Sequence, residues 1–254
     1  MYVVVGLGYF GKIIKSKLKD DLVITVDPYN KDADYTCVED VPVSDGYWFV
    51  VTPASTHYDV INRVINKGVQ NIWVEKPICT NLEESKLILC RKPDIYCDYT
   101  WLKHPMVEIL ETYSDDINHL SLKWLNDGTH IPSDVSLVSD LVIHPLSIIV
   151  HILGMVFKHT VVFKNEATVI ISGRAGVGTF TIEVSNESKT KYRSVAAYSK
   201  ITTYRWSTAD PLNIENHGII PDVDAIEENI KAFKQGKVNT DISQILYDIN
   251  ESCK

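Results

Sequence analysis

The sequence opens with YVVVGLGYFG at residues 2–11, where a β-branched run meets three glycines spaced GxGxxG. Tyr2–Val5 predicts a strand and residues 9–19 predict a helix, so the glycines lie at a strand-to-helix turn. In such a turn the first glycine permits a tight bend, the second lets a pyrophosphate approach the backbone, and the third lets helix and strand pack closely. The helix N-terminus also faces the phosphate charge. The motif therefore indicates a dinucleotide site, although an ordinary glycine-rich turn has the same pattern.

Asp27 lies where a dinucleotide site needs a carboxylate. It ends a second predicted strand, Leu22–Val26, roughly 20 residues after the glycines begin. At that position an acidic side chain accepts hydrogen bonds from both ribose hydroxyls. Pro28, Tyr29 and Asn30 follow, so no Arg or Lys stands directly behind Asp27 to receive a 2′-phosphate. We therefore expect NAD as the cofactor in preference to NADP; the alternative for Asp27 is a turn residue before proline.

The first hundred residues alternate apolar runs with helical stretches. Further strands are predicted at residues 47–51, 71–74 and 94–97, and helices at 57–66 and from the N-cap Asn81 to Leu89. Strands that alternate with helices form a parallel sheet covered on both faces. Residues 1–99 are thus predicted to form a Rossmann nucleotide-binding domain in an α/β fold.

The pattern changes after residue 100. Helices are predicted at 105–113, 139–153, 222–234 and 241–253, and strands at 119–125, 160–164, 168–172, 178–185, 193–198 and 202–207. Residues 179–185 alternate strictly between apolar and polar side chains, which indicates a sheet with one buried face. Residues 100–254 are therefore predicted to form a reduced α+β domain with a mostly antiparallel open sheet and helices on one face.

Composition narrows the class of protein. The 254 residues include 33 acidic and 25 basic side chains, which gives a net charge of −8, and 45% are apolar. This acidic balance argues against nucleic-acid or anionic-membrane partners, which usually need clustered Lys and Arg. No apolar stretch approaches the roughly 20 residues of a membrane-spanning helix, and the N-terminus lacks the features of a secretory signal. The five cysteines are odd in number and never spaced CxxC, so we expect no disulfide framework, no metal site and a reducing, cytoplasmic location.

Three further segments share a pattern with one family. They are Thr52-Pro53 with His57 after the third strand, Glu75-Lys76-Pro77 after the fourth, and Asp140-Leu141-Val142-Ile143-His144 at a helix start. Together with GLGYFG they make the chain resemble the glucose–fructose oxidoreductase / inositol dehydrogenase / rhizopine catabolism (Gfo/Idh/MocA) family. The resemblance implies an NAD(P)-dependent dehydrogenase or reductase that acts on a secondary hydroxyl or carbonyl of a sugar, cyclitol or sugar derivative. It also implies a homo-oligomer assembled through the open sheet of the second domain.

The resemblance assigns roles to residues. Lys76 takes the place of the family's catalytic or substrate-binding lysine, and Asp140 and His144 take those of its aspartate and histidine. Oxidising a carbinol sends a hydride to the nicotinamide while the hydroxyl proton must leave, which suits a base near neutrality such as histidine. We therefore expect His144 as general acid/base, Lys76 as electrostatic partner or relay, and Asp140 as substrate anchor, with Asp140 and His144 on one helix face. The expected cofactor contacts are Gly6, Gly8, Tyr9, Phe10, Gly11, Asp27, Thr52, Pro53, His57, Glu75 and Lys76.

Each catalytic candidate also has a plainer explanation. His144 in an apolar helix is typical of a hydrogen-bonded core histidine, Lys76 of a solvated lysine at a strand end, and Asp140 of a helix start. In relatives the peptide before the proline of Glu-Lys-Pro can be cis, and we take this as the hypothesis for Lys76–Pro77.

Other residues near the expected site are harder to assign. The segment Tyr99–Pro105 lacks the arginine that relatives carry ahead of this proline, so Lys103 or His104 would have to take its role. Trp124 and His130 are further candidates to line a pocket.

Two other functions fit part of the pattern. A catalytically silent NAD-binding regulator uses the same fold, but the presence of Lys76, Asp140 and His144 together favours an enzyme. An S-adenosylmethionine-dependent methyltransferase also has a glycine-rich turn followed by an acidic strand end. The third glycine and Glu75-Lys76-Pro77 disfavour it.

Overall fold

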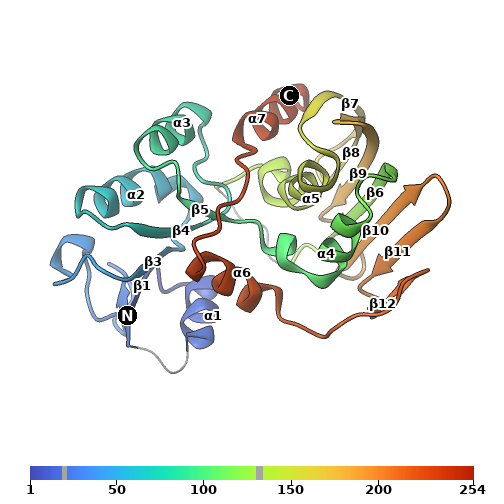
Figure 1. Ribbon diagram of the computed structural model, residues 1–254. Helices are drawn as coiled ribbons and strands as arrows, with labels where there is room; N and C mark the ends of the chain where they lie inside the picture. The colour runs from blue at the N-terminus through green and yellow to red at the C-terminus, as the bar shows by residue number, and fades with distance from the viewer. Residues whose placement is uncertain (19–21, 130–133) are drawn as a thin grey trace. The chain divides into compact units, whose positions relative to one another are not determined.

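The computed structural model describes residues 1–18, 22–129 and 134–254 (Figure 1). Its residues divide into two units: unit 1 comprises Met1–Asp98 and Ile230–Asn239, and unit 2 comprises Tyr99–Asn229 and Thr240–Lys254. The sequence predicts a boundary at residues 99 and 100 and does not predict the return of Ile230–Asn239 to unit 1. No helix among the described residues is long and apolar enough to cross a bilayer.

Unit 1 is built on a parallel sheet of five strands in the order β2-β1-β3-β4-β5. The strands are β1 (Tyr2–Val5), β2 (Val23–Val26), β3 (Tyr47–Val50), β4 (Asn71–Glu75) and β5 (Tyr96–Asp98). The helices that connect them are α1 (Tyr9–Lys17), α2 (His57–Asn66) and α3 (Leu82–Arg91), with short 3-10 turns η1 (Val38–Asp40) and η2 (Ala54–Thr56). α2 and α3 lie on one face of the sheet and α1 on the other (Figure 1). The strand order reverses between β1 and β3, and sheets of this kind bind ligands at the carboxyl ends of the strands beside such a reversal.

Aromatic rings fill the core of unit 1 on the α1 side. Phe10 of α1 stacks on Trp73 of β4 with ring centroids 6.2 Å apart, and Phe49 of β3 lies 5.5 Å from Trp73. Phe233, near the end of α6 (Ala225–Lys234), lies 5.5 Å from both Phe49 and Tyr96. A side chain from the last quarter of the chain thus completes this core, which explains why Ile230–Asn239 belong to unit 1.

Unit 2 is built on an eight-stranded sheet in the order β13-β12-β11-β10-β6-β9-β8-β7. Its strands are β6 (Ile117–Leu125), β7 (Val156–Lys164), β8 (Thr168–Ala175), β9 (Gly178–Ser185), β10 (Tyr192–Ser199), β11 (Thr203–Ser207), β12 (Asp210–Glu215) and β13 (Gly218–Ile219). Its other elements include η3 (Thr100–Lys103), α4 (Pro105–Thr112), α5 (Ile143–Leu153) and α7 (Ser243–Ser252). β6 and β9 pair in parallel and the other neighbours are antiparallel, so the predicted mostly antiparallel sheet is confirmed.

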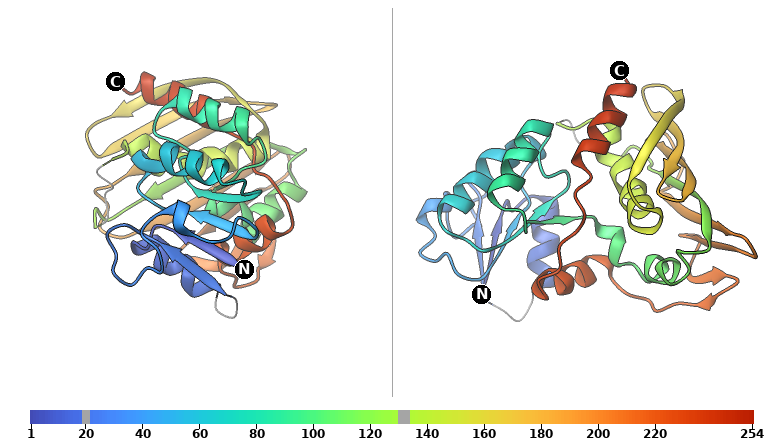
Figure 2. Two further views of the ribbon diagram at one scale, coloured as in Figure 1. Left: turned by 90° about the vertical axis from the view of Figure 1, so that its left-hand side faces the viewer. Right: turned by 45° about the horizontal axis from the view of Figure 1, so that its top comes forward.

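The two faces of this sheet differ in polarity. α5 packs against one face, as the right-hand view of Figure 2 shows. On β6 the side chains of Leu120, Leu122 and Trp124 are buried on that face, whereas Lys123 is exposed and Ser121 half-buried on the opposite one. The alternation therefore gives one core face and one polar face.

Two local features differ from the sequence prediction. β12 and β13 were not expected, because Asp210, Pro211 and Asn213 are residue types that strands disfavour. The helix predicted at 139–153 begins instead as a π-helical turn, η4 (Val138–Val142), followed by α5. Pro145 has no N–H to donate to the carbonyl four residues earlier, so the regular α-helical ladder cannot run unbroken through this point.

Candidate dinucleotide site

The three glycines of the turn have different structural roles. Gly6 has φ +100°, and a β-carbon there would lie 2.7 Å from the carbonyl oxygen of Val51. A β-carbon on Gly11 would lie 1.9 Å from the carbonyl oxygen of Gly6, so α1 could not pack on β1. Gly8 instead faces open space, with no heavy atom within 4 Å of where its β-carbon would be. Gly6 and Gly11 therefore build the turn, and Gly8 leaves the backbone open to a ligand.

The start of α1 suits an anion. Gly8 is the N-cap and has no side chain to occupy the first N–H groups, and the first turn contains no acidic residue. Uncapped N–H groups and the positive end of the helix dipole both favour a phosphate at this point.

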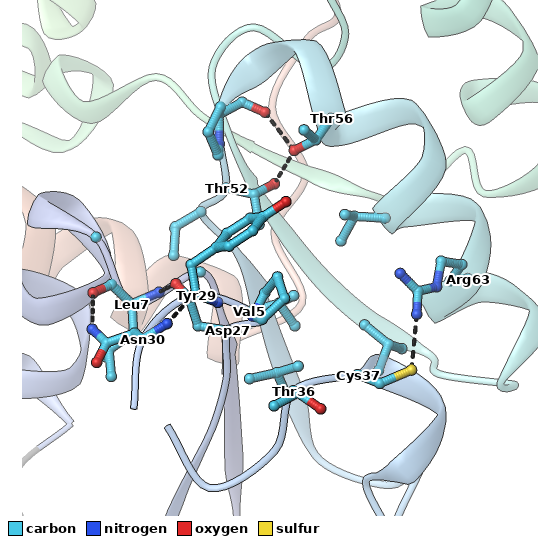
Figure 3. A pocket seen from close by; sticks show the side chains of 18 of the residues that line it. Val5, Leu7, Asp27, Tyr29, Asn30, Thr36, Cys37, Thr52, Thr56 and Arg63 are labelled. Atoms are coloured by element: carbon cyan, nitrogen blue, oxygen red, sulfur yellow. Dashed lines mark hydrogen bonds between the residues drawn. The ribbon is translucent and has the colours of Figure 1, made fainter. Parts of the chain in front are cut away.

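Asp27 is fixed beside this turn by three backbone N–H groups. Its Oδ2 accepts a hydrogen bond from Leu7 at 2.7 Å, and its Oδ1 accepts from Tyr29 at 2.8 Å and Asn30 at 3.0 Å. The Asn30 side chain donates to the Leu7 carbonyl at 3.0 Å, so the Leu7 residue is held on both sides (Figure 3). Asp27 thus forms the turn after β2 and also faces the ligand side. Because a carboxylate oxygen accepts two hydrogen bonds, Oδ2 retains capacity for a ribose hydroxyl.

A pocket of about 860 Å³ opens beside the turn, with all its lining residues in unit 1 (Figure 3). It is lined by residues 5–8, 26–31, 36–38, 51–53, 56, 59, 60 and 63. This volume lies in the range of roughly 300–1,000 Å³ that small-molecule sites occupy. Of the predicted cofactor contacts, the structure brings together Gly6, Gly8, Asp27, Thr52 and Pro53 in this lining.

The other predicted contacts lie outside this lining. Tyr9 is exposed at the start of α1, Phe10 packs on Trp73, and Gly11 is buried against Gly6. Glu75 and Lys76 are half-buried at and just beyond the end of β4. The peptide between Lys76 and Pro77 is cis, as the hypothesis required.

His57 is fully buried and acts as a link behind the pocket. Its Nδ1 lies 2.9 Å from the carbonyl oxygen of Pro77, and its Nε2 lies 2.9 Å from that of Thr52. Thr52 lines the pocket, so His57 fixes the backbone of one pocket wall to the segment after β4.

Sequence reasoning missed one wall of the pocket. Thr56, Asp59, Val60 and Arg63 line it and recur at spacing i, i+3, i+4 and i+7, so they occupy one helical face. The spacing analysis that located this helix used its apolar face. Spacing alone also groups Asp59, Val60 and Arg63 on one face, but an exposed helix face has many explanations, so the sequence does not mark this face as a pocket wall.

The remaining catalytic candidates lie in unit 2. Asp140 belongs to η4 and His144 to the first turn of α5, and both side chains are half-buried. π-Helical turns are frequent at functional sites. Lys76 belongs to unit 1, so the expectation that Lys76, Asp140 and His144 share one active site stays a prediction.

His104 cannot replace the missing arginine as a cation at neutral pH. Burial lowers the pKa of its imidazole to about 4. Its Nδ1 accepts a hydrogen bond from the Met106 N–H at 3.2 Å as the cap of α4, and its ring centroid lies 4.8 Å from that of Trp206. The structural role of His104 is therefore to begin a helix and fill an aromatic cluster.

Arg193 is a cation in unit 2 that the sequence analysis missed. Its guanidinium lies 5.9 Å from the ring centroid of Trp124, which is fully buried. Burial lowers the pKa of Arg193 to about 10, opposed by the charges of Asp140 and Asp127. A positive group near Asp140 is thus available in this unit, while His130 lies outside the described residues.

Comparison with known proteins agrees with this geometry. Residues 1–91 match the model of the Gfo/Idh/MocA family, described as an oxidoreductase family with an NAD-binding Rossmann fold. The resemblance is confirmed over residues 1–91, which are similar to the nucleotide-binding domain of that family. No curated protein matches the sequence.

Solved structures match nearly the whole chain. A myo-inositol dehydrogenase from Corynebacterium glutamicum has a TM-score of 0.78 at 15% identity, covering 99% of this chain and 94% of that one. The UDP-N-acetylglucosamine 3-dehydrogenase GnnA from Acidithiobacillus ferrooxidans has a TM-score of 0.83 at 16% identity, covering 99% and 96%. A levoglucosan dehydrogenase in complex with NADH and L-sorbose has a TM-score of 0.81 at 12% identity, again covering 99% and 96%. At such identities the likeness shows the fold, and the predicted two-part α/β architecture is confirmed.

Proposed function

We propose that the protein is an NAD-dependent oxidoreductase that transfers a hydride between nicotinamide and a secondary hydroxyl or carbonyl of a sugar, cyclitol or sugar derivative. One observation carries the proposal: the open backbone at Gly8 lies beside a carboxylate, Asp27, that three N–H groups hold at the pocket wall. The matched family and the three dehydrogenases named above support the class of reaction.

The residues present fit a dinucleotide. The space at Gly8 and the uncapped start of α1 accept a pyrophosphate, and Asp27 has an oxygen for the ribose. A 2′-phosphate beside Asp27 would place like charges together, which favours NAD over NADP. Lys31 also lines the pocket, so NADP is disfavoured by Asp27 and not by a lack of cations. When bound, the nicotinamide supplies the hydride acceptor or donor.

In this proposal, side chains of the protein transfer the hydroxyl proton and hold the substrate. Lys76 follows β4 at the carboxyl end of the parallel sheet, the edge where such sheets bind ligands. His144 holds or releases the hydroxyl proton, Lys76 stabilises the developing negative charge, and Asp140 anchors a neighbouring hydroxyl. One structural neighbour is in complex with L-sorbose, which supports a polyol or sugar substrate.

We also propose self-association and a cytoplasmic location. The face of the unit 2 sheet that carries Ser121 and Lys123 is polar and is the surface through which we expect the homo-oligomer to assemble. All five cysteines are free thiols, which supports a reducing compartment.

A melting series tests cofactor class first. NADH at about 100 times its dissociation constant should add roughly 2.7 kcal/mol of stability, while NADPH and S-adenosylmethionine should add less at the same concentration. Stabilisation by S-adenosylmethionine alone would overturn the proposal.

Turnover then separates an enzyme from a silent regulator. Polyols and sugars are offered with NAD, and NADH formation is followed for the wild type and for Lys76→Ala and His144→Asn. We expect both variants to bind NADH and to lose activity by about 10²–10⁴-fold, the usual contribution of a positioned acid/base. NADH binding without turnover of any substrate would favour the regulator, and full activity of Lys76→Ala would remove that residue from the mechanism.

A further inference from the structure

The pocket in unit 1 continues beyond Asp27 to an end that the proposed function leaves unassigned. Cys37 and Val38 contribute to this end from the β2–β3 connection, and Val60 and Arg63 contribute from α2. In Figure 3 the glycine-turn residue Leu7 lies at the left of the pocket and Arg63 at the right, with Cys37 beside Arg63. The two ends therefore present different chemistry: backbone N–H groups at one, and a guanidinium with valine side chains at the other.

Arg63 is held in one orientation by a bidentate salt bridge with Glu39. Its Nε donates to Glu39 Oε1 at 2.7 Å, and its Nη2 donates to Glu39 Oε2. Nη2 also lies 3.0 Å from the sulfur of Cys37. Because both N–H groups donate to the same carboxylate, the plane of the guanidinium is fixed.

This ion pair orients the Arg63 guanidinium but contributes little to the free energy of folding. The two side chains are 43% and 54% exposed, and exposed pairs contribute little to folding stability. The guanidinium lowers the pKa of Glu39 to about 2, with a smaller effect from Cys37, so the pair is fully charged at neutral pH. Among the described residues Nη1 of Arg63 has no hydrogen-bond partner, so one edge of the group remains available.

The orientation of a bound dinucleotide determines which of its groups lies at the Arg63 end of the pocket. The pyrophosphate belongs at the glycine turn and the adenosine ribose at Asp27, so the base must extend past Asp27, away from the turn. An adenine ring is flat and apolar on its faces, with ring nitrogens that accept hydrogen bonds. A guanidinium plane stacks on such rings and donates at its edge, and Val38 and Val60 supply apolar contact.

We propose that Arg63 contacts the adenine base of the dinucleotide and that Glu39 is the positioning residue that sets the guanidinium for this contact. The proposal rests on the proposed NAD site and extends it to recognition of the base. It excludes a simple role of Arg63 as a point charge for the phosphates, which bind at the opposite end of the pocket.

Calorimetric titration of NADH and ADP-ribose into Arg63→Ala and Arg63→Lys tests the contact with the base. Both ligands carry the adenosine, and ADP-ribose lacks the nicotinamide. We expect about a tenfold rise in the dissociation constant of both ligands for both variants, since lysine keeps the charge but not the plane. Arg91→Ala is the matched control, because Arg91 is an exposed arginine bonded to Asn62 and Asn66 of α2 but outside the pocket lining.

The possible results are distinguishable. A wild-type protein that binds neither ligand removes the proposed function and this inference together. A wild-type protein that binds both, with unchanged affinity in Arg63→Ala, removes only the inference. Wild-type affinity in Arg63→Lys would show that charge suffices and would overturn the planar contact.

A double-mutant cycle tests the part of Glu39. Glu39→Gln should raise the dissociation constant for NADH about threefold in the wild-type background and leave it unchanged in Arg63→Ala. A merely structural role would lower affinity equally in both backgrounds, and circular dichroism confirms that each variant is folded. Equal losses, or no loss at all, would remove Glu39 from the site.

Discussion

At the candidate dinucleotide site, the presence or absence of single atoms determines whether a ligand can approach the backbone. At Gly8 the absence of a β-carbon leaves open space, while at Gly6 and Gly11 a β-carbon would meet backbone. Asp27 is equally specific, because its two oxygens are shared between three N–H groups and the pocket. The chemistry of this turn therefore follows from a few hydrogen bonds and one missing side chain.

Replacement of Asp27 tests this hydrogen-bonding pattern. In Asp27→Asn an NH₂ group must face at least one backbone N–H, so we expect a loss of about 1–3 kcal/mol in the free energy of unfolding. Loss of the negative charge should also lower the affinity for NADH and reduce the difference in affinity between NADH and NADPH. Urea denaturation and titration measure both effects, with exposed Asp32→Asn in the same loop as control. An unaltered free energy of unfolding would contradict the structure of this turn.

His57 provides a second test at the level of one residue. His57→Ala removes a buried ring whose two nitrogens each lie 2.9 Å from a carbonyl oxygen. A neutral imidazole donates one N–H, so at least one of these oxygens loses its hydrogen bond and the ring leaves a cavity; we expect about 2–4 kcal/mol of destabilisation. His151, which is exposed and bonded to Glu111 at 3.2 Å, supplies the control His151→Ala, with little change. Equal effects of the two substitutions on chemical denaturation would show that His57 is not a structural link.

Individual elements show where sequence patterns suffice and where they fail. The five strands and three helices of unit 1 follow from β-branched runs, helical spacing and caps such as Asn81, which accepts hydrogen bonds from the N–H groups of Glu83 and Glu84. β12 could not be found because Pro211 and Asn213 oppose a strand and only pairing with β11 imposes one. The π-helical turn at Asp140 likewise depends on the break that Pro145 makes in the helix. Phe233 packs into unit 1 through long-range contacts that no local pattern contains.

The candidate site divides in the same way. The sequence singles out the glycines and Asp27 because the dinucleotide-binding motif needs each of them for a stated reason. The glycines allow close approach to the backbone, and the carboxylate of Asp27 can accept hydrogen bonds from the ribose hydroxyls. The wall formed by Asp59, Val60 and Arg63 was not predicted, because an exposed polar helix face has many explanations.

The start of α4 predicts a pH dependence of stability. The pKa of His104 lies near 4 in the folded chain against an ordinary 6.5, so between these values the unfolded chain binds more protons. Stability should therefore be complete above pH 6.5 and fall as the pH drops toward 4, by about 1–2 kcal/mol at pH 5.

His104→Asn isolates this effect, because asparagine still caps the helix but does not titrate. Its free energy of unfolding should vary less between pH 7 and pH 5 than that of the wild type, whatever its absolute value. Parallel pH profiles for wild type and His104→Asn would contradict the assignment.

At the scale of the whole molecule, the chain combines a parallel nucleotide-binding sheet with a mostly antiparallel sheet whose second face is polar. This face predicts self-association, which light scattering after gel filtration measures. Ser121 of β6 pairs with Ala196 of β10 on it, and both are half-buried. We expect an oligomeric wild type, a smaller species for Ser121→Arg, and no change for exposed Thr190→Arg. A monomeric wild type, or an unaffected Ser121→Arg protein, would contradict assembly through this face.

The most direct test of the central claim is calorimetric titration of NADH into Gly8→Ala beside the wild type. Gly8 has φ −75° and open space around its β-carbon position, so the free energy of unfolding should change by no more than about 1 kcal/mol. The added methyl group occupies the place where a pyrophosphate meets the backbone, so the dissociation constant should rise at least about tenfold. Unchanged NADH affinity in a folded Gly8→Ala protein would mean that the cofactor does not lie along this turn.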